Sequence, residues 1–286
     1  MNVGEGAGQY LSEMSSSDFP TDQRQENIAV FVTARLGSSR LPGKVLADIE
    51  GRPALWYILD RMNLPTLPNL RVLNTSSNPN DDPLVEFAEL NGWKWFRGDE
   101  EDVIARHLGS ATQYDVDFFV NVEGDSPFCS YEHVDLIIRR YQETNADYIS
   151  CHGLPLGGAP IGVKVSALRD VCARKGETKT QGWGKYFVQS GLYQTERLDA
   201  EESLNRPHYR VTLDYPEDLE FFRAVVKAMD PGHNTALNIR DIVAYLDEHP
   251  ETAGINQARS EEYWARFNRE HGAFTMSKEP EAPAKS

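Results

Sequence analysis

Short apolar runs alternate with helical patterns along the first half of the chain, and this alternation restricts the fold more than any other feature. Residues 28–32 (IAVFV) are fully apolar and rich in β-branched side chains, as expected of a strand buried on both faces. Similar runs follow at 70–74 and 117–122. The pattern predicts an α/β fold, a three-layer, mostly parallel, doubly wound sheet that binds ligands outside the carboxyl ends of its strands.

The remaining elements are predicted from the same periodicities and from their caps. Asp82 is expected to cap a helix whose first residue is Pro83. The other predicted helices span 54–62, 99–113, 131–143, 216–229, 238–250 and 260–272. The other predicted strands span 93–96, 145–151, 161–165, 186–194 and 208–214.

The two ends of the chain differ in composition from its body. Residues 1–27 are rich in Gly, Ser and acids without periodicity, so they are predicted to be a disordered tail. Residues 275–286 have a similar character and are predicted to be a second tail. A single domain is therefore expected over 28–274. No basic stretch precedes an apolar one near the start, so no secretory signal is expected.

The net charge of −15 argues against general nucleic-acid binding, which needs clustered Lys and Arg. No segment has the length of a membrane span. The three cysteines form no CxxC motif and are interpreted as free thiols in a reducing compartment. We therefore expect a cytoplasmic protein that binds neither membranes nor nucleic acid, although a local basic pocket for a small anion remains compatible with the acidic total.

The segment 33–46 (TARLGSSRLPGKVL) concentrates cations directly after the first predicted strand. It contains Arg35, Arg40 and Lys44 together with Gly37 and Gly43. Backbone N–H groups of a glycine-containing loop can bind phosphate oxygens, and arginine adds bidentate donors. The sequence matches neither GxxxxGK[ST] nor GxGxxG. An anion site is favoured over the alternative, a basic surface loop.

Two acids follow predicted strands. Asp125 lies in VNVEGDSPF and Asp214 in VTLDYPEDLEFF. Carboxylates at strand ends are suitable ligands for Mg²⁺, which often takes only one or two from the protein. Each acid also fits the role of a turn or helix cap, and for each one in isolation that simpler interpretation is favoured.

Together these motifs resemble the cytidylyltransferase family, which includes the CMP-sugar-acid synthetases. The resemblance is greatest to the branch of spore coat polysaccharide biosynthesis protein F. It rests on ARLGSSRLPGKVL, on the segment 74–111, on VNVEGDSPF and on VTLDYPEDLEF, in the family's order over roughly 28–225. The resemblance implies a Rossmann-like nucleotidyltransferase fold of the glycosyltransferase-A type.

The resemblance also implies a reaction, in which an acceptor oxygen attacks the α-phosphorus of a nucleoside triphosphate, usually CTP, and pyrophosphate leaves. The acceptor would be a sugar, a sugar acid or a phosphonate, and a homodimer is expected. Catalytic cations would be Arg35, Arg40 and Lys44, because charge builds on the leaving group. Asp125 and Asp214 would hold Mg²⁺. The implied nucleotide-binding residues are Ala34, Leu36, Gly37, Thr75, Ser76, Arg97 and Glu123.

The chain departs from the family pattern in the region that usually shapes the acceptor pocket. It has Gly162 and Lys164 in PIGVKV, and Gln181, Trp183 and Lys185 in KTQGWGKYFVQ. The additional lysines indicate an anionic acceptor, such as a carboxylate or a phosphonate. The alternative, which has equal weight, places Lys164 on an edge strand and Lys185 at a loop cap.

Other functions stay open at this point. One is a guanylyltransferase or another transferase that forms nucleotide sugars. A glycosyltransferase on a related fold usually needs a DxD metal motif after a strand. The DVD sequence at 115–117 lies before a predicted strand, so this function is disfavoured. A non-catalytic nucleotide-binding protein is the third alternative, motivated by the departures in the acceptor region.

Overall fold

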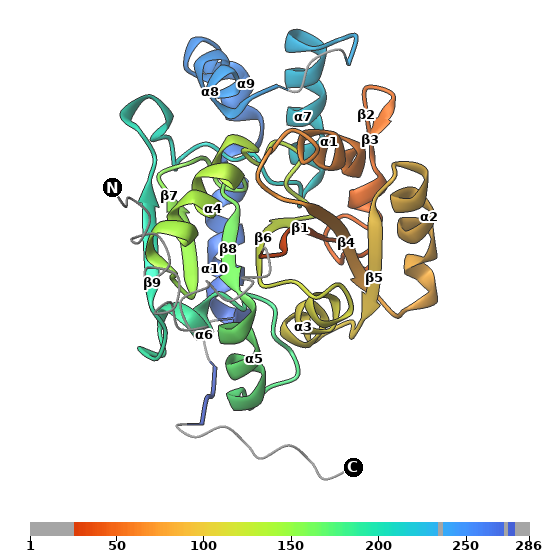
Figure 1. The fold of residues 1–286 in the computed structure, drawn as a ribbon. Helices are drawn as coiled ribbons and strands as arrows, with labels where there is room; N and C mark the ends of the chain where they lie inside the picture. The colour runs from red at the N-terminus through yellow and green to blue at the C-terminus, as the bar shows by residue number, and fades with distance from the viewer. Residues whose placement is uncertain (1–25, 234–236, 272–273, 278–286) are drawn as a thin grey trace, which may run out of the picture.

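A seven-stranded sheet with the order β5-β4-β1-β6-β8-β7-β9 forms the centre of the molecule (Figure 1). The computed structural model describes residues 26–233, 237–271 and 274–277. Neighbouring strands pair in parallel except at β8, which is antiparallel to both β6 and β7. The predicted mostly parallel α/β sheet is therefore confirmed. The strands are β1 (Ile28–Thr33), β4 (Leu70–Ser76), β5 (Lys94–Gly98), β6 (Phe118–Glu123), β7 (Tyr148–His152), β8 (Ile161–Lys164) and β9 (Thr195–Asp199).

Helices cover both faces of the sheet, which explains why β1 is apolar at every position from Ile28 to Val32. Val30 and Val32 pack on one side of β1, and Ala29 and Phe31 pack on the other. The first side is covered by α1 (Ala54–Arg61), α2 (Asp82–Leu90) and α4 (Glu132–Thr144). The second is covered by α3 (Val103–Gln113), α5 (Val165–Arg174) and α6 (Lys185–Val188).

The C-terminal helices build a third apolar cluster next to the sheet. It joins α7 (Pro216–Met229), α8 (Ile239–Glu248) and α9 (Pro250–Gln257) to α1 and to the hairpin of β2 (Asp48–Ile49) and β3 (Arg52–Pro53). From this group α10 (Arg259–His271) runs toward α6 (Figure 1). In the described part of the chain, no helix combines the length and hydrophobicity that a membrane crossing requires.

Several predicted elements of the second half were wrong. Residues 186–194 form no strand, because Tyr186 and Phe187 are buried from the short helix α6 and Gly191 has a φ of 71°. Residues 208–214 form no strand, because His208 and Tyr209 lie in a turn and a bend and Arg210 makes a single isolated bridge, to Leu156. The predicted helix 238–250 ends earlier, and the separate helix α9 begins at Pro250.

The ends of the body are held by specific contacts. Asn27 donates its backbone N–H to Asp117 Oδ2 at 2.8 Å; the predicted N-terminal tail otherwise lies outside the described residues, apart from Glu26. Within the predicted C-terminal tail, Thr275 accepts from Gly176 N at 3.2 Å and Ser277 donates to Arg174 O at 2.9 Å. Residues 278–286 lie outside the described part.

The register of β1 and β6 brings their carboxyl ends together. Thr33 pairs with Glu123, and Gly124 N donates to Thr33 O at 2.8 Å. A Cβ on Gly124 would lie 2.6 Å from Ala34 Cβ, so only glycine permits this approach. The strand order reverses between β1 and β6, which is where open α/β sheets bind ligands.

Candidate active site

A cleft of about 760 Å³ opens at the carboxyl ends of β1 and β6. Most of its lining residues come from the segments 33–45, 123–125, 156–161 and 181–189, together with Asp214 and the cleft-facing side of α10. The predicted cationic loop and both predicted acids therefore border the same space, although 89 residues separate Asp125 from Asp214 in the sequence (214 − 125 = 89).

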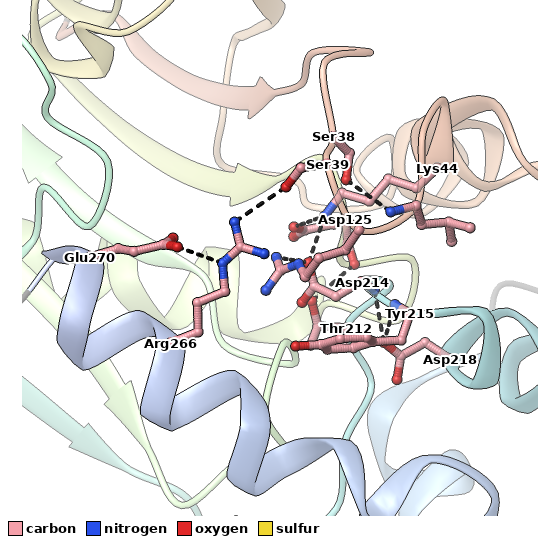
Figure 2. Close-up of polar contacts among 12 residues, drawn as sticks. Ser38, Ser39, Lys44, Asp125, Thr212, Asp214, Tyr215, Asp218, Arg266 and Glu270 are labelled. Carbon is pink, nitrogen blue, oxygen red and sulfur yellow. Dashed lines mark hydrogen bonds and ion pairs between the residues drawn. The ribbon is translucent and has the colours of Figure 1, made fainter.

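The two acids converge on one positive charge. Lys44 Nζ donates to Asp125 Oδ2 at 2.6 Å and to Asp214 Oδ1 at 2.8 Å (Figure 2). Arg40 forms a further ion pair with Asp214 Oδ1, and Arg210 pairs with Asp214 Oδ2 at 3.1 Å. The Asp214 side chain is 1% exposed, whereas that of Asp125 is 28% exposed. Asp214 is therefore the buried centre of the cluster, and Asp125 faces the cleft.

Backbone contacts hold the two acids side by side. Leu213 N donates to Asp125 O at 2.7 Å, which joins the segment before α7 to the turn after β6. Asp218, in the first turn of α7, accepts from Asp214 N at 2.8 Å and from Tyr215 N at 2.9 Å. It also accepts from Arg210 Nε at 2.7 Å. This buried Arg210–Asp218 pair fixes the backbone of Asp214.

The ion pairs decide the protonation of the cluster. Burial opposes the charged form of Asp214, but Lys44, Arg40 and Arg210 outweigh it and hold its pKa below the usual range. Burial likewise opposes the charge of Lys44, but Asp125 and Asp214 outweigh it and raise the pKa of its ammonium group. Both side chains are therefore ionised at neutral pH.

The cationic loop is anchored at its beginning. Leu36 N donates to Asp81 Oδ1 at 2.7 Å, and the buried Asp81 also accepts from Ser76 Oγ. Arg35 Nη1 donates to Glu101 Oε1 at 3.1 Å. Helix α2 begins one residue earlier than predicted, at Asp82, so Asp81 and not Asp82 occupies the N-cap position; the Asp81 carboxylate makes no capping hydrogen bond and holds the loop instead.

Glu123 lies at the end of β6 and lines the cleft. Its side chain remains exposed to the cleft, yet protein surrounds the carboxyl group closely. This enclosure, and secondly the Asp125 carboxylate, raise the pKa of Glu123 to about 7. Asn121 Nδ2 donates to Glu123 Oε1 at 2.9 Å and orients it.

The other predicted nucleotide-binding residues divide into two groups. Ala34 and Gly37 line the cleft together with Glu123. Leu36 uses its N–H on Asp81, and Thr75 and Ser76 are fully buried. Arg97 donates to Ser76 O at 2.9 Å and pairs with Asp82 at 2.5 Å. This second group lies outside the cleft lining, and within it Leu36 and Ser76 are joined to the base of the loop through Asp81.

The predicted acceptor residues also separate. Gln181, Trp183 and Lys185 line the cleft. Trp183 is buried, with its ring 5.2 Å from that of His107. Lys164 does not border the cleft, and its Nζ donates to Asn145 Oδ1 at 2.8 Å. Gly162 is required by packing, since a Cβ there would lie 2.4 Å from Ile137 Cγ2.

The sequence profile described as cytidylyltransferase matches residues 29–241, most of the folded body and all of the cluster around Asp214. The chain belongs to the cytidylyltransferase family. Its predicted membership and its predicted enzyme class, a CTP-using nucleotidyltransferase, are thereby confirmed.

Similar proteins support the family assignment. Spore coat polysaccharide biosynthesis protein SpsF of Bacillus subtilis is 28% identical over 246 residues, which is 81% of this chain and 99% of SpsF. A cytidylyltransferase structure from Leptospira borgpetersenii has a TM-score of 0.72 at 21% identity, over 80% of this chain and 97% of that one. CMP:2-keto-3-deoxy-manno-octonic acid synthetase complexed with CTP has a TM-score of 0.56 at 16% identity, over 71% and 99%. The structural likenesses show the fold.

The donor set of this cytidylyltransferase fits a hard divalent cation. Asp125 and Asp214 place carboxylate oxygens on either side of a single position, and the Lys44 ammonium group contacts both of them there. No cluster of three or more His, Cys, Asp or Glu residues suited to a metal occurs in the described ranges. Mg²⁺ accepts such a site, because it completes its coordination with substrate phosphates and water.

Sequence reasoning missed the residues that support the acids and the far wall of the cleft. Asp218 lies within the motif around Asp214 and Arg210 directly precedes that motif, but their pairing depends on how α7 begins. For Arg106 the sequence left two positions open, in the site or facing solvent; the side chain lines the cleft, and its Nη1 donates to Asp99 O at 2.7 Å. Tyr263 and Arg266 come from α10, beyond the residues matched by the family profile.

Proposed function

We propose that this protein is a Mg²⁺-dependent cytidylyltransferase that joins CMP to an oxygen of a sugar, sugar acid or phosphonate and releases pyrophosphate. The observation that supports this most is the convergence of Arg40 and Lys44, from the loop after β1, on Asp125 and Asp214 in one cleft. A triphosphate requires cations and a metal site next to each other, and the adjacent cations and carboxylates of this cleft support that role.

The loop and the acids have complementary roles in the proposal. Arg35, Arg40, Lys44 and the loop N–H groups bind the triphosphate and stabilise charge on the leaving pyrophosphate. Asp125 and Asp214 would hold Mg²⁺, which supplies positive charge at the α-phosphate and lowers the pKa of the attacking hydroxyl. Arg40 and Lys44 pair with the two acids in this structure. On substrate binding these cations would exchange the carboxylates for phosphate oxygens, and the metal would take the place of the cations beside the carboxylates.

Nucleotide recognition is assigned to residues at the β1 and β6 ends. Ala34, Gly37 and Glu123 border the cleft and are proposed to contact nucleotide directly. Leu36, Thr75, Ser76 and Arg97 are proposed to act indirectly, since Ser76 contacts Asp81 and Asp81 anchors the loop at Leu36. The homodimer expected from the resemblance stays a prediction, and analytical ultracentrifugation, which measures the mass of the assembly in solution, tests it.

The acceptor is proposed to be anionic, with a sugar acid as the leading class. Lys185, Gln181 and Trp183 border the same cleft as the acids. A fold neighbour is a synthetase that links CMP to the sugar acid in its name. Lys164 is left out of this proposal because its ammonium group contacts Asn145 outside the cleft lining.

The proposal is tested with purified protein, Mg²⁺, CTP and a panel of sugar acids, phosphonates and neutral sugars, with mass-spectrometric detection of products. We expect pyrophosphate and a CMP-linked product with at least one acid, and much less turnover with GTP, UTP or ATP. A parallel assay supplies nucleotide sugars in place of CTP, and release of nucleoside diphosphate there would favour a glycosyltransferase. Tight CTP binding without turnover across the panel would favour a non-catalytic nucleotide-binding protein.

A further inference from the structure

Helix α10 lies beyond residues 29–241 matched by the family profile, yet one of its faces borders the cleft. Tyr263, Arg266, Phe267 and Glu270 occur at helical positions i, i+3, i+4 and i+7, so they share that face. Figure 2 shows α10 with Arg266 and Glu270 pointing toward the loop after β1 and the two acids. A helix that only packed on the body would present an apolar stripe there, whereas this stripe contains two charged side chains.

Arg266 reaches the cationic loop directly. Its Nη2 donates to Ser39 Oγ at 3.2 Å, and its Nε donates to Glu270 Oε1 at 2.8 Å. Ser39 lies between Gly37 and Gly43, in the part of the loop proposed to bind phosphate. A phosphate oxygen bound at Ser39 would therefore be within reach of the Arg266 guanidinium group.

The charges of the cleft favour a role for this additional cation. Arg40 and Lys44 are paired with buried or half-buried acids, and Arg35 is paired with Glu101. The Arg266 side chain is 33% exposed, and its partner Glu270 comes from the same helix and is 39% exposed. Exposed pairs of this kind are weak, so a phosphate group can replace Glu270 at small cost.

We propose that Arg266 binds the β- or γ-phosphate of the bound triphosphate and thereby stabilises the leaving pyrophosphate. The guanidinium group is suited to this because it donates two parallel hydrogen bonds to phosphate oxygens. Helix α10 is then a wall of the active site, and Tyr263 holds it against the site, with its ring centre 5.7 Å from the Arg40 guanidinium carbon and 5.0 Å from that of Arg210. This inference rests on the proposed function and deepens it.

The test compares CTP and CMP binding by isothermal titration calorimetry in the wild-type protein and in Arg266→Gln. Loss of a charge-assisted hydrogen bond to a terminal phosphate should weaken CTP binding about 10-fold, whereas CMP, which lacks those phosphates, should bind as before. Arg266→Lys should recover part of the CTP affinity. Arg269→Gln is the matched control, because it removes the same charge from an exposed position of the same helix outside the cleft lining.

Three results would overturn the inference. They are unchanged CTP affinity in Arg266→Gln, an equal loss in Arg269→Gln, or an equal loss of CTP and CMP affinity, which would indicate a structural role for the side chain. If Arg266→Gln does not fold, Arg266→Lys is used for the same comparison, with an expected loss of CTP affinity and none for CMP. If the wild-type protein binds no CTP at all, the proposed function itself fails. If the wild-type protein binds CTP and Arg266→Gln binds it equally well, only the role of Arg266 fails, so the two failures are distinguishable.

Discussion

At the scale of single residues, Asp125 and Asp214 have similar sequence contexts but different environments. Asp214 is buried and contacts Arg40, Lys44 and Arg210, whereas Asp125 shares only Lys44 among these cations and faces the cleft. Asp214 therefore contributes to folding as well as to the site. Asp125 contributes mainly to the site.

Substitution should separate these two roles. Asp214→Asn leaves buried cations without their common partner and should lower the free energy of unfolding by about 3–5 kcal/mol. Asp125→Asn should lower it by less than about 1 kcal/mol, because that side chain is partly solvated. Both should lose pyrophosphate release. Urea denaturation and product assays measure the two effects, and equal stability losses in the two variants would contradict the different roles.

His107 provides a pH-dependent contribution to stability. It is fully buried, and Thr33 Oγ1, which donates to Asn121, lies 2.8 Å from its Nε2. Burial, and secondly the nearby Arg106, lower the pKa of His107 to about 3. The unfolded chain binds a proton below about pH 6.5 and the folded protein does not, so stability should fall between pH 6.5 and 3 by up to about 1.4 kcal/mol per pH unit.

Replacing His107 should remove that dependence. In His107→Gln, which keeps a donor near Thr33, the free energy of unfolding should depend less steeply on pH between 6.5 and the onset of acid unfolding. Exposed His208 is the control, and His208→Gln should keep the wild-type slope. Denaturant melts at several pH values measure the slopes. An unchanged slope in His107→Gln would show that another group causes the acid sensitivity.

At the scale of elements, β8 depends on the absence of a side chain at one position. Gly162 pairs with Val120 of β6 and Ile149 of β7, and a Cβ would lie 2.4 Å from Ile137 Cγ2 and 2.7 Å from Phe118 Cζ. The sequence had placed Gly162 among changes in the acceptor pocket. The close packing of α4 against this position instead explains why the residue is glycine.

Gly162→Ala should therefore destabilise the protein by about 1–3 kcal/mol, because the core above it cannot expand freely. Gly254→Ala in α9 is the matched control. Apart from its chain neighbours and the backbone of its own helix, no atom lies within 4 Å of its Cβ position, so the substitution should stabilise the helix by about 0.5–1 kcal/mol. Thermal or urea unfolding distinguishes the two signs. A stabilised Gly162→Ala variant would contradict the packing of β8 against α4.

The elements of the first half could be predicted because local patterns and tertiary burial agree there. The segment 28–32 is apolar on both faces and is β1, and its βα partners follow in order. The segment 208–214 has an equally good strand pattern, but its backbone binds Leu156 and Asp125 instead of a sheet neighbour. Periodicity describes which residues can be buried and does not specify which backbone partner is available.

The convergence of the main candidate site residues was predictable, and the contacts that support them were less so. Arg40, Lys44, Asp125 and Asp214 are brought together as the motif order indicated. The anchoring of the loop by Asp81 and the contact of Arg266 with Ser39 join segments that are 45 and 227 residues apart in the sequence. Such distant pairings leave no local signal in a single sequence.

At the scale of the whole molecule, an acidic protein concentrates positive charge at one place. The net charge is −15, yet Arg35, Arg40, Lys44, Arg106 and Arg266 all border the same cleft. The acidic remainder of the surface disfavours polyanions, while the cleft retains a local field for a small anionic substrate. This distribution fits a nucleotide-using enzyme better than a nucleic-acid-binding protein.

The most direct test of the account is a crystal structure of the protein with CTP and Mg²⁺. We predict the triphosphate on the loop after β1, the metal between Asp125 and Asp214, and Lys44 moved from the acids to phosphate. A triphosphate bound elsewhere, or a metal that contacts neither acid, would contradict the claim that this loop and these acids form one active site.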